Sequence, residues 1–88
     1  MSQSSPRARV AIVEDDAILR EELARVVTGA DGMDVVGTAE TLAAGQTLLT
    51  STPDVLLVDL ALPDGNGVDL IAEARTKIPA IKIVVVSR

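Results

Sequence analysis

Cysteine, histidine and aromatic residues are all absent from this chain, and each absence excludes a class of site. Without cysteine, the chain builds no disulfide and no thiolate zinc site, which fits a reducing compartment. Without histidine, it holds no Ser-His-Asp or Cys-His catalytic unit, no imidazole metal ligand and no phosphohistidine. The net charge of −5 and the lack of aromatic stacking surfaces argue against direct binding of nucleic acid.

Long apolar runs and low-complexity segments are absent as well. No stretch approaches the roughly 20 apolar residues that cross a membrane, so we expect no membrane association. The polar stretch MSQSSPR (1–7) has no apolar run behind it, and we interpret it as a disordered N-terminal tail rather than a signal peptide. Together with the lack of cysteine, these features favour a cytoplasmic location.

The chain does contain 48% hydrophobic residues among its 88, enough for one small domain over residues 8–88. Short apolar runs alternate with segments of helical periodicity. The pattern predicts strands over 8–14, 33–39, 54–60 and 81–87, and helices over 16–28, 40–51 and 66–77. This alternation predicts an α/β fold of the doubly wound type, a parallel sheet with helices on both faces and a site beyond the carboxyl ends of the strands.

Polar side chains follow three of the four predicted strands. Glu14 and Asp15 come at the end of the first, Asp59 at the end of the third and Ser87 at the end of the fourth. Neighbouring parallel strands bring such groups to the same edge of a sheet. Two carboxylates about 4 Å apart repel by about 4 kcal/mol at an effective dielectric constant of 20, so the cluster favours a bound cation. Oxygen ligands of this kind suit Mg²⁺.

Each of these signals also has a plain structural explanation. Asp16 is better explained as a helix N-cap than as a chemical group. Glu14 fits a solvated charge at a strand end, and Asp59 alone fits the first residue of a loop. The stretch PDGNG (63–67) is by itself a turn signature. Only the joint placement at equivalent strand ends favours a functional site.

Three stretches together carry a resemblance to a known family: VAIVEDD (10–16), PDVLLVDLALPDGNGVDLI (53–71) and IVVVS (83–87). The chain resembles the receiver domain of bacterial two-component response regulators, from about Arg9 to its end. The middle stretch is the most specific, because Asp59, Leu62-Pro63 and Gly67 reproduce the family's spacing. The resemblance implies the flavodoxin-like version of the doubly wound parallel sheet.

The resemblance also implies roles for individual residues. Asp59 would accept a phosphoryl group from a sensor histidine kinase. Mg²⁺ would be held by Asp59 and Asp15 directly, by Glu14 through a metal-bound water, and by the backbone carbonyl of Ala61. Ser87 matches the family's switch residue, whose hydroxyl moves to a phosphoryl oxygen. Such a domain is no enzyme beyond its own phosphorylation and dephosphorylation, and the middle stretch resembles receivers attached to DNA-binding output domains.

The carboxyl end of the chain departs from the family. A complete receiver has five strands in the order 2-1-3-4-5, and this chain supplies strands 2-1-3-4 with three helices. The fifth strand, with its phosphate-pairing Lys, and the last two helices are missing, so we expect a receiver truncated after its fourth strand or a piece of a longer protein. The strand over 81–87 would then be an exposed edge beside a bare sheet face, which predicts a homodimer or other self-association.

Two other functions stay open. A phosphorylation-independent interaction module would keep the acidic pocket without accepting a phosphoryl group. A Mg²⁺-dependent phosphotransferase or Toprim-like enzyme also places a Glu after an early strand, but it needs an Asp-x-Asp pair at a later strand end. The residue two after Asp59 is Ala61, which disfavours that enzyme.

Overall fold

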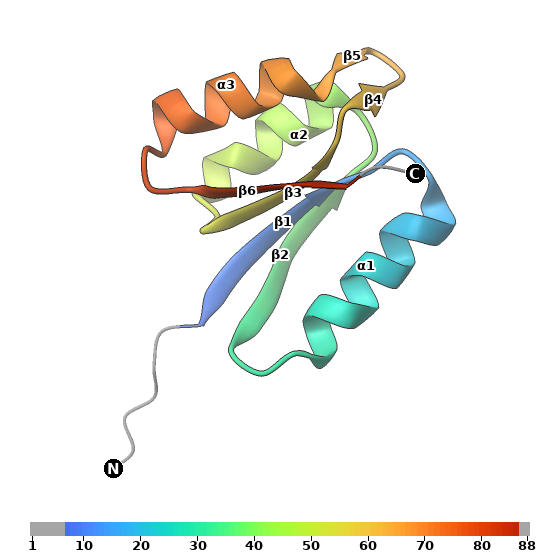
Figure 1. Ribbon diagram of the computed structural model, residues 1–88, viewed down its shortest axis with the longest axis vertical. Coiled ribbons are helices and arrows are strands. Elements are labelled where there is room, and N and C mark those ends of the chain that lie inside the picture. The colour runs from blue at the N-terminus through green and yellow to red at the C-terminus, as the bar shows by residue number, and fades with distance from the viewer. Residues whose placement is uncertain (1–6, 87–88) are drawn as a thin grey trace.

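A four-stranded parallel sheet forms the centre of the computed structural model, which describes residues 7–86 (Figure 1). Its strands lie in the order β2-β1-β3-β6. They are β1 (Ala8–Val13), β2 (Met33–Ala39), β3 (Val55–Asp59) and β6 (Lys82–Val86). This order confirms the predicted flavodoxin-like arrangement, with β6 as the fourth of the predicted strands.

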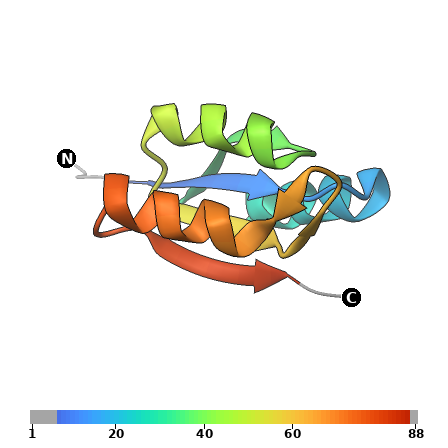
Figure 2. The same ribbon diagram turned by 90° about the horizontal axis from the view of Figure 1, so that it is seen from above.

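Helices cover both faces of this sheet. Helices α2 (Leu42–Leu48) and α3 (Gly67–Lys77) lie on one face, and α1 (Ala17–Gly29) lies on the other (Figure 1 and Figure 2). Right-handed β-α-β crossovers in a parallel sheet produce this layering. The carboxyl ends of all four strands therefore point to the same edge of the molecule.

Strand β1 is buried on both faces, because it lies between β2 and β3. Its residues Ala11 and Val13 join the core beneath α2 and α3. The alternate residues Val10 and Ile12 join a second cluster with Val27 of α1. The continuous apolar run that predicts this strand thus serves two cores, as expected for a doubly wound sheet.

Helix α1 begins where the side chain of Asp16 accepts the backbone N–H of Leu19 at 2.9 Å. This hydrogen bond confirms that Asp16 is a helix N-cap. The helix ends at Gly29, and Gly32 then turns the chain into β2 with a φ of +81°, a conformation that costs glycine little.

The helix predicted over 40–51 is shorter in the structure and changes type. Helix α2 begins after Thr41, whose hydroxyl accepts a backbone N–H of the first turn at 3.0 Å. At its carboxyl end the chain tightens into the 3-10 helix η1 (Leu49–Ser51). The cause is local: Thr52 adopts the left-handed conformation, and it precedes Pro53, whose ring disfavours the right-handed α conformation for the residue before it. The other predicted helices and strands agree to within one residue at each described end, and residue 87, where the last predicted strand ends, lies outside the described residues.

A short hairpin stands where the sequence predicts only a turn. Strands β4 (Ala61–Leu62) and β5 (Gly65–Asn66) pair antiparallel, and the chain turns between them through Pro63 and Asp64. Asn66 then caps α3 by accepting a backbone N–H of its first turn at 2.9 Å. The hairpin therefore lies directly between Asp59 and α3.

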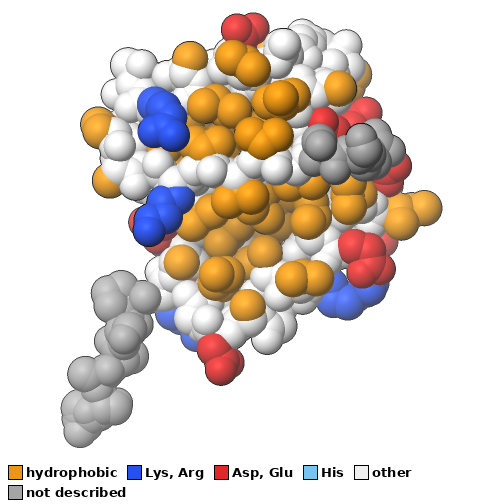
Figure 3. Space-filling view, viewed as in Figure 1, with side chains coloured by type: hydrophobic (Ala, Val, Ile, Leu, Met, Phe, Trp, Pro, Cys, Tyr) orange, Lys and Arg blue, Asp and Glu red, His pale blue; other side chains and the backbone are white. Residues whose placement is uncertain are grey.

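Strand β6 forms one edge of the sheet and carries apolar side chains on both faces. Val84 and Val85 are 47% and 48% exposed. Helix α1 packs against β1 and β2, and Figure 3 shows apolar side chains gathered over the sheet between α1 and the α2–α3 layer. None of the helices within residues 7–86 is long and apolar enough to span a membrane.

Candidate functional site at the carboxyl ends of the strands

Three acidic residues meet at the carboxyl ends of the two central strands. Glu14 and Asp15 follow β1, and Asp59 is the last residue of β3, which pairs with β1. Glu14, Asp15 and Asp59 each offer one carboxylate oxygen, and these oxygens all lie within 4.8 Å of one another. Glu14 and Asp59 are buried, whereas Asp15 is exposed. We refer to these three residues as the carboxyl rim.

Glu14 occupies the most costly position in the carboxyl rim. Its Oε2 accepts the backbone N–H of Asp16 at 3.0 Å, but its Oε1 is buried and has no hydrogen-bond partner within residues 7–86. Burial raises the pKa of Glu14, and the nearby carboxyl groups of Asp15 and Asp59 raise it further, although the Asp16 N–H opposes them. A bound cation would offset this cost.

The loop after β3 holds the carboxylate of Asp59. The backbone N–H of Ala61 donates to Asp59 Oδ1 at 3.0 Å, and the N–H of Gly67 donates to the carbonyl of Leu60 at 2.8 Å. A Cβ at position 67 would overlap the carbonyl oxygen of Asp59 and would lie 2.9 Å from Leu60 Cα. Glycine is therefore required there for the chain to return so closely past Asp59.

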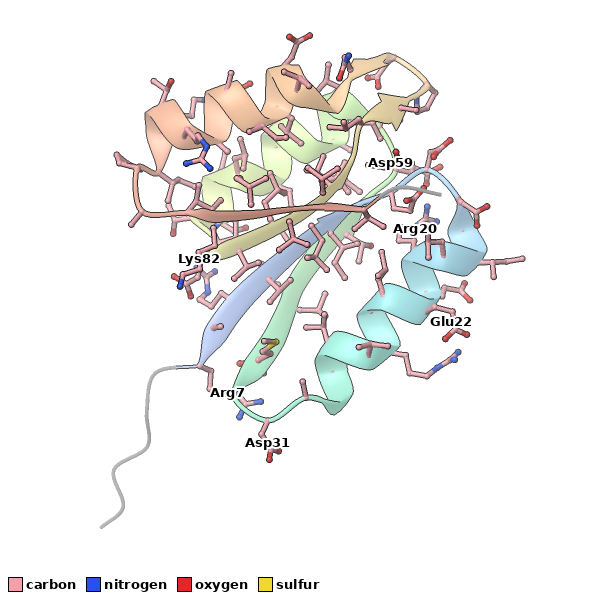
Figure 4. The ribbon with its side chains drawn as sticks, in the orientation of Figure 1. Arg7, Arg20, Glu22, Asp31, Asp59 and Lys82 are labelled. Atoms are coloured by element: carbon pink, nitrogen blue, oxygen red, sulfur yellow. The ribbon has the colours of Figure 1, made fainter. Side chains whose placement is uncertain are left out.

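Arg20 also lies beside the carboxyl rim, although sequence reasoning did not single it out. Its Nη1 donates to the backbone carbonyls of Glu14 at 2.8 Å and Asp15 at 3.4 Å. Figure 4 shows Arg20 near Asp59, at the end of the molecule opposite Lys82. The signal available in the sequence is its spacing, because Arg20 follows the Asp16 cap by one helical turn. Arg20 ties the first turn of α1 to the backbone that carries the two acids.

Ser87, the predicted switch residue, lies outside the described residues. Val86, the last residue of β6, pairs in register with Asp59, so β6 reaches the edge at which the carboxyl rim lies. Lys82 starts β6 beside Val55 at the other end of the sheet, and Lys77 forms an ion pair with Glu73 on α3. Neither lysine lies at the strand end where the acids meet.

The chemistry of the carboxyl rim fits a hard divalent cation. Its donors are carboxylate oxygens, which Mg²⁺ prefers, and Mg²⁺ usually takes only one or two of them together with water and phosphate oxygens. The observation that most favours a cation is the buried Glu14 Oε1, which lacks a partner in the part of the chain that the structure describes. The residues of the carboxyl rim that could hold a metal are thus Glu14, Asp15 and Asp59.

Comparison with known proteins decides the family. A family model for the response regulator receiver domain matches residues 10–88, almost the whole chain. The chain belongs to the response regulator receiver family. Receiver domains bind Mg²⁺ at an acidic pocket and interact with histidine kinases, and a receiver domain is not itself an enzyme. The Toprim-like alternative is therefore excluded, and the phosphorylation-independent alternative is not favoured.

Individual relatives agree with this family. The KDP operon transcriptional regulatory protein KdpE of Escherichia coli is 40% identical over 79 residues, which are 89% of this chain and 34% of KdpE. A protein-glutamate methylesterase/protein-glutamine glutaminase of Myxococcus xanthus is 36% identical over 80 residues, 90% of this chain and 23% of that protein. The receiver domain described here thus spans about a quarter to a third of these relatives.

Solved structures extend the agreement to the fold. The signal receiver domain of the putative response regulator NarL from Mycobacterium tuberculosis superposes with a TM-score of 0.85 at 27% identity. The superposition covers 94% of this chain and 68% of the NarL chain. The receiver fold of this chain is therefore shared with receivers that contain further residues.

Proposed function

We propose that this receiver domain accepts a phosphoryl group on Asp59 from the phosphohistidine of a sensor histidine kinase. The observation that carries the proposal is the carboxyl rim, where Asp59 lies within 4.8 Å of oxygens from Glu14 and Asp15. Three like charges at one strand edge are costly unless the site handles a cation and a phosphoryl group. In a phosphorylation-independent module the same acids would repel one another, although no step of its function would need them close together.

The transfer step follows from how Asp59 is held. Its Oδ2 attacks phosphorus, so an O–P bond forms while the N–P bond of the phosphohistidine breaks. The electron pair of the N–P bond stays on the imidazole nitrogen of the donor, which takes a proton from water as it leaves. Because the Ala61 N–H fixes Oδ1 at 3.0 Å, the carboxylate is already oriented when the donor arrives. The kinase supplies the activated phosphoryl group in its phosphohistidine.

Mg²⁺ is the cofactor in this proposal. Glu14, Asp15 and Asp59 would hold it, with the backbone carbonyl of Ala61 as the remaining protein ligand and Glu14 acting through a metal-bound water. When bound, Mg²⁺ neutralises the charge that develops on the transferring phosphoryl oxygens. Arg20 keeps the backbone of the two adjacent acids in place through its hydrogen bonds to their carbonyls.

Ser87 is the switch residue in this proposal. Its hydroxyl would donate to a phosphoryl oxygen, and the register of Val86 with Asp59 supports a role for the residue that follows Val86. Phosphorylation adds negative charge and acceptor oxygens, which is how a local change can move a strand end. The transcriptional regulators among the relatives support an output in transcription, carried by another part of the protein.

Self-association and a cytoplasmic location complete the proposal. The edge strand β6 carries two half-exposed valines, Val84 and Val85, and no strand within residues 7–86 pairs with its outer edge. An edge of this kind is a template for a second copy. Sedimentation equilibrium of the protein distinguishes a dimer from a monomer.

The absence of cysteine supports a location in the reducing interior of the cell.

Phosphorylation with a small-molecule donor tests the assignment of Asp59. We expect the protein, incubated with acetyl phosphate and Mg²⁺, to gain the mass of one phosphoryl group. Asp59→Asn should gain none. The matched control is Asp54→Asn, which alters an exposed aspartate at the other end of the same strand and should still react. An equal mass gain in Asp59→Asn and the unaltered protein, measured by intact-mass spectrometry, would refute the assignment.

A further inference from the structure

Asp64, at the turn of the β4–β5 hairpin, joins that hairpin to a helix far away in the sequence. Its Oδ1 accepts the backbone N–H of Leu42 at 2.6 Å, and its Oδ2 accepts that of Ala43 at 3.0 Å. These hydrogen bonds span more than 20 residues of sequence. One carboxylate therefore uses both of its oxygens to hold the start of α2.

The contact between the hairpin and α2 is close as well as hydrogen-bonded. A Cβ at Gly65 would lie 2.6 Å from Leu42 Cδ2, so the hairpin backbone rests directly against α2. The two N–H groups of Leu42 and Ala43 hold the pKa of Asp64 below its ordinary value. The folded state therefore favours the ionised form of Asp64.

Helix α2 has a second, separate cap. The hydroxyl of Thr41 accepts the N–H of Ala44 at 3.0 Å. Thr41 and Asp64 therefore share the first turn of the same helix, but only Asp64 belongs to the hairpin. A substitution at Thr41 therefore removes a cap of α2 and leaves the hairpin's hydrogen bonds to α2 in place, whereas a substitution at Asp64 removes those hydrogen bonds.

The other end of the hairpin reaches the phosphoacceptor of the proposed function. Ala61, in β4, donates its N–H to Asp59 Oδ1 at 3.0 Å. Beyond β5, the N–H of Gly67 donates to the carbonyl of Leu60 at 2.8 Å. A continuous set of contacts thus runs from the first turn of α2, through Asp64 and the hairpin, to the carboxylate of Asp59.

We infer that Asp64 is a positioning residue, which orients the carboxylate of Asp59 by anchoring the β4–β5 hairpin to the first turn of α2. It acts through Ala61 and touches neither the reacting atoms nor the metal ligands' oxygens. The inference deepens the proposed function and rests on it for the role of Asp59. It applies to this chain because position 64 is an aspartate, whose two oxygens can accept two adjacent N–H groups.

Amide hydrogen exchange at Ala61 in the metal-free protein tests the anchoring directly. We expect Asp64→Ala to speed exchange of the Ala61 N–H several-fold, because the hairpin loses its anchor. Thr41→Ala is the matched control: it removes a cap from the same helix and should leave exchange at Ala61 unchanged. Asp64→Asn keeps one carbonyl oxygen as acceptor and should give an intermediate exchange rate, which also serves if Asp64→Ala fails to fold.

Mg²⁺ affinity provides the second measurement, by titration calorimetry. Removing residues that orient metal ligands typically costs about 10–100-fold in affinity, and we expect Asp64→Ala to lie near tenfold. Thr41→Ala should bind Mg²⁺ as the unaltered protein does.

The two measurements separate this inference from the proposed function. Unchanged exchange at Ala61 in both Asp64 variants would overturn the inference, as would equal exchange in Asp64→Ala and Thr41→Ala. Failure of the unaltered protein to bind Mg²⁺ would instead refute the proposed function, while exchange at Ala61 would still decide whether Asp64 anchors the hairpin.

Discussion

The two ends of the sheet hold their carboxylates in opposite ways. At the amino end, Asp34 accepts from Arg7 Nε at 2.8 Å, and Asp54 accepts the backbone N–H of Arg9 at 2.8 Å. We call these four residues the amino rim. At the carboxyl rim the acids face one another instead, and Glu14 retains a buried oxygen without a hydrogen-bond partner within residues 7–86. Figure 4 shows Arg7 and Lys82 at one end of the molecule and Asp59 at the other.

This difference shows which end serves stability and which serves chemistry. The amino rim closes the fold: Arg9 also donates its Nη1 to the carbonyls of Ser51 and Thr52, at 2.6 and 2.8 Å, where η1 ends. The carboxyl rim raises the pKa of Glu14 through burial and neighbouring acids. A buried acid with a raised pKa beside other acids is the usual signature of a functional site.

The largest expected effect comes from neutralising Glu14. We expect Glu14→Gln to raise the free energy of unfolding of the metal-free protein by about 1–3 kcal/mol, because the amide is uncharged and can donate to the neighbouring carboxylates, whereas the buried carboxylate oxygen has no such partner within residues 7–86. The same change should weaken Mg²⁺ binding by at least about tenfold, because it removes a negative charge from the site. Urea denaturation in the presence of a chelator and calorimetric titration measure the two effects.

The amino rim supplies the control for Glu14. Asp34→Asn removes an acid of similar type, but one that has a partner, so it should not stabilise the protein and should leave Mg²⁺ affinity unchanged. If Glu14→Gln destabilised the metal-free protein as a paired acid does, the contrast between the two rims would be wrong.

A smaller effect is expected from the pH dependence of Asp64, which lies near the carboxyl rim but is fully paired. Its folded pKa lies below the ordinary value of 3.8, so the folded state binds this proton less tightly than the unfolded state. Asp64 therefore contributes stability above pH 3.8, and this contribution is lost as the pH falls through the lowered folded pKa.

Comparison with Asp64→Asn isolates this term, because asparagine does not titrate. The difference in unfolding free energy between the unaltered protein and Asp64→Asn should stay constant above about pH 5 and shrink at lower pH. Glu73, whose pKa is lowered chiefly by Lys77, is present in both proteins and cancels. A difference that stays constant down to the lowest pH at which both proteins fold would contradict the pairing of Asp64.

The smallest effect should come from Arg7, at the amino rim. Its ion pair with Asp34 is exposed, with side-chain exposures of 54% and 51%, and such pairs are screened by salt. Arg7→Ala should therefore shift the urea midpoint less than Glu14→Gln does, and the shift should fall further as salt is added. A large loss of stability that does not change with salt would mean that the Arg7–Asp34 ion pair stabilises the amino rim more than the hydrogen bonds of Arg9 do.

Much of the fold could be predicted from local patterns. The alternation of apolar runs with helical periodicity predicts the doubly wound parallel sheet, and the family resemblance implies its strand order. Asp16 and Asn66 are recognisable as helix caps because each acts within its own first turn. The β4–β5 hairpin and the anchoring role of Asp64 could not be predicted in this way. Asp64 accepts hydrogen bonds from Leu42 and Ala43, which lie far from it in the sequence. From its local sequence alone, PDGNG is recognisable only as a turn.

The sequence by itself determined the alternation of elements, the family motif around Asp59 and the absence of thiol, imidazole and aromatic chemistry. These follow from residue identity and near-neighbour spacing. Only the tertiary structure decided that Glu14 is buried with one oxygen that has no partner among residues 7–86, that Arg20 holds the acidic turn, and that α2 contacts the hairpin that follows Asp59. The physical reason is that burial and electrostatic environment depend on neighbours across strands and layers, which the order of residues along the chain does not record.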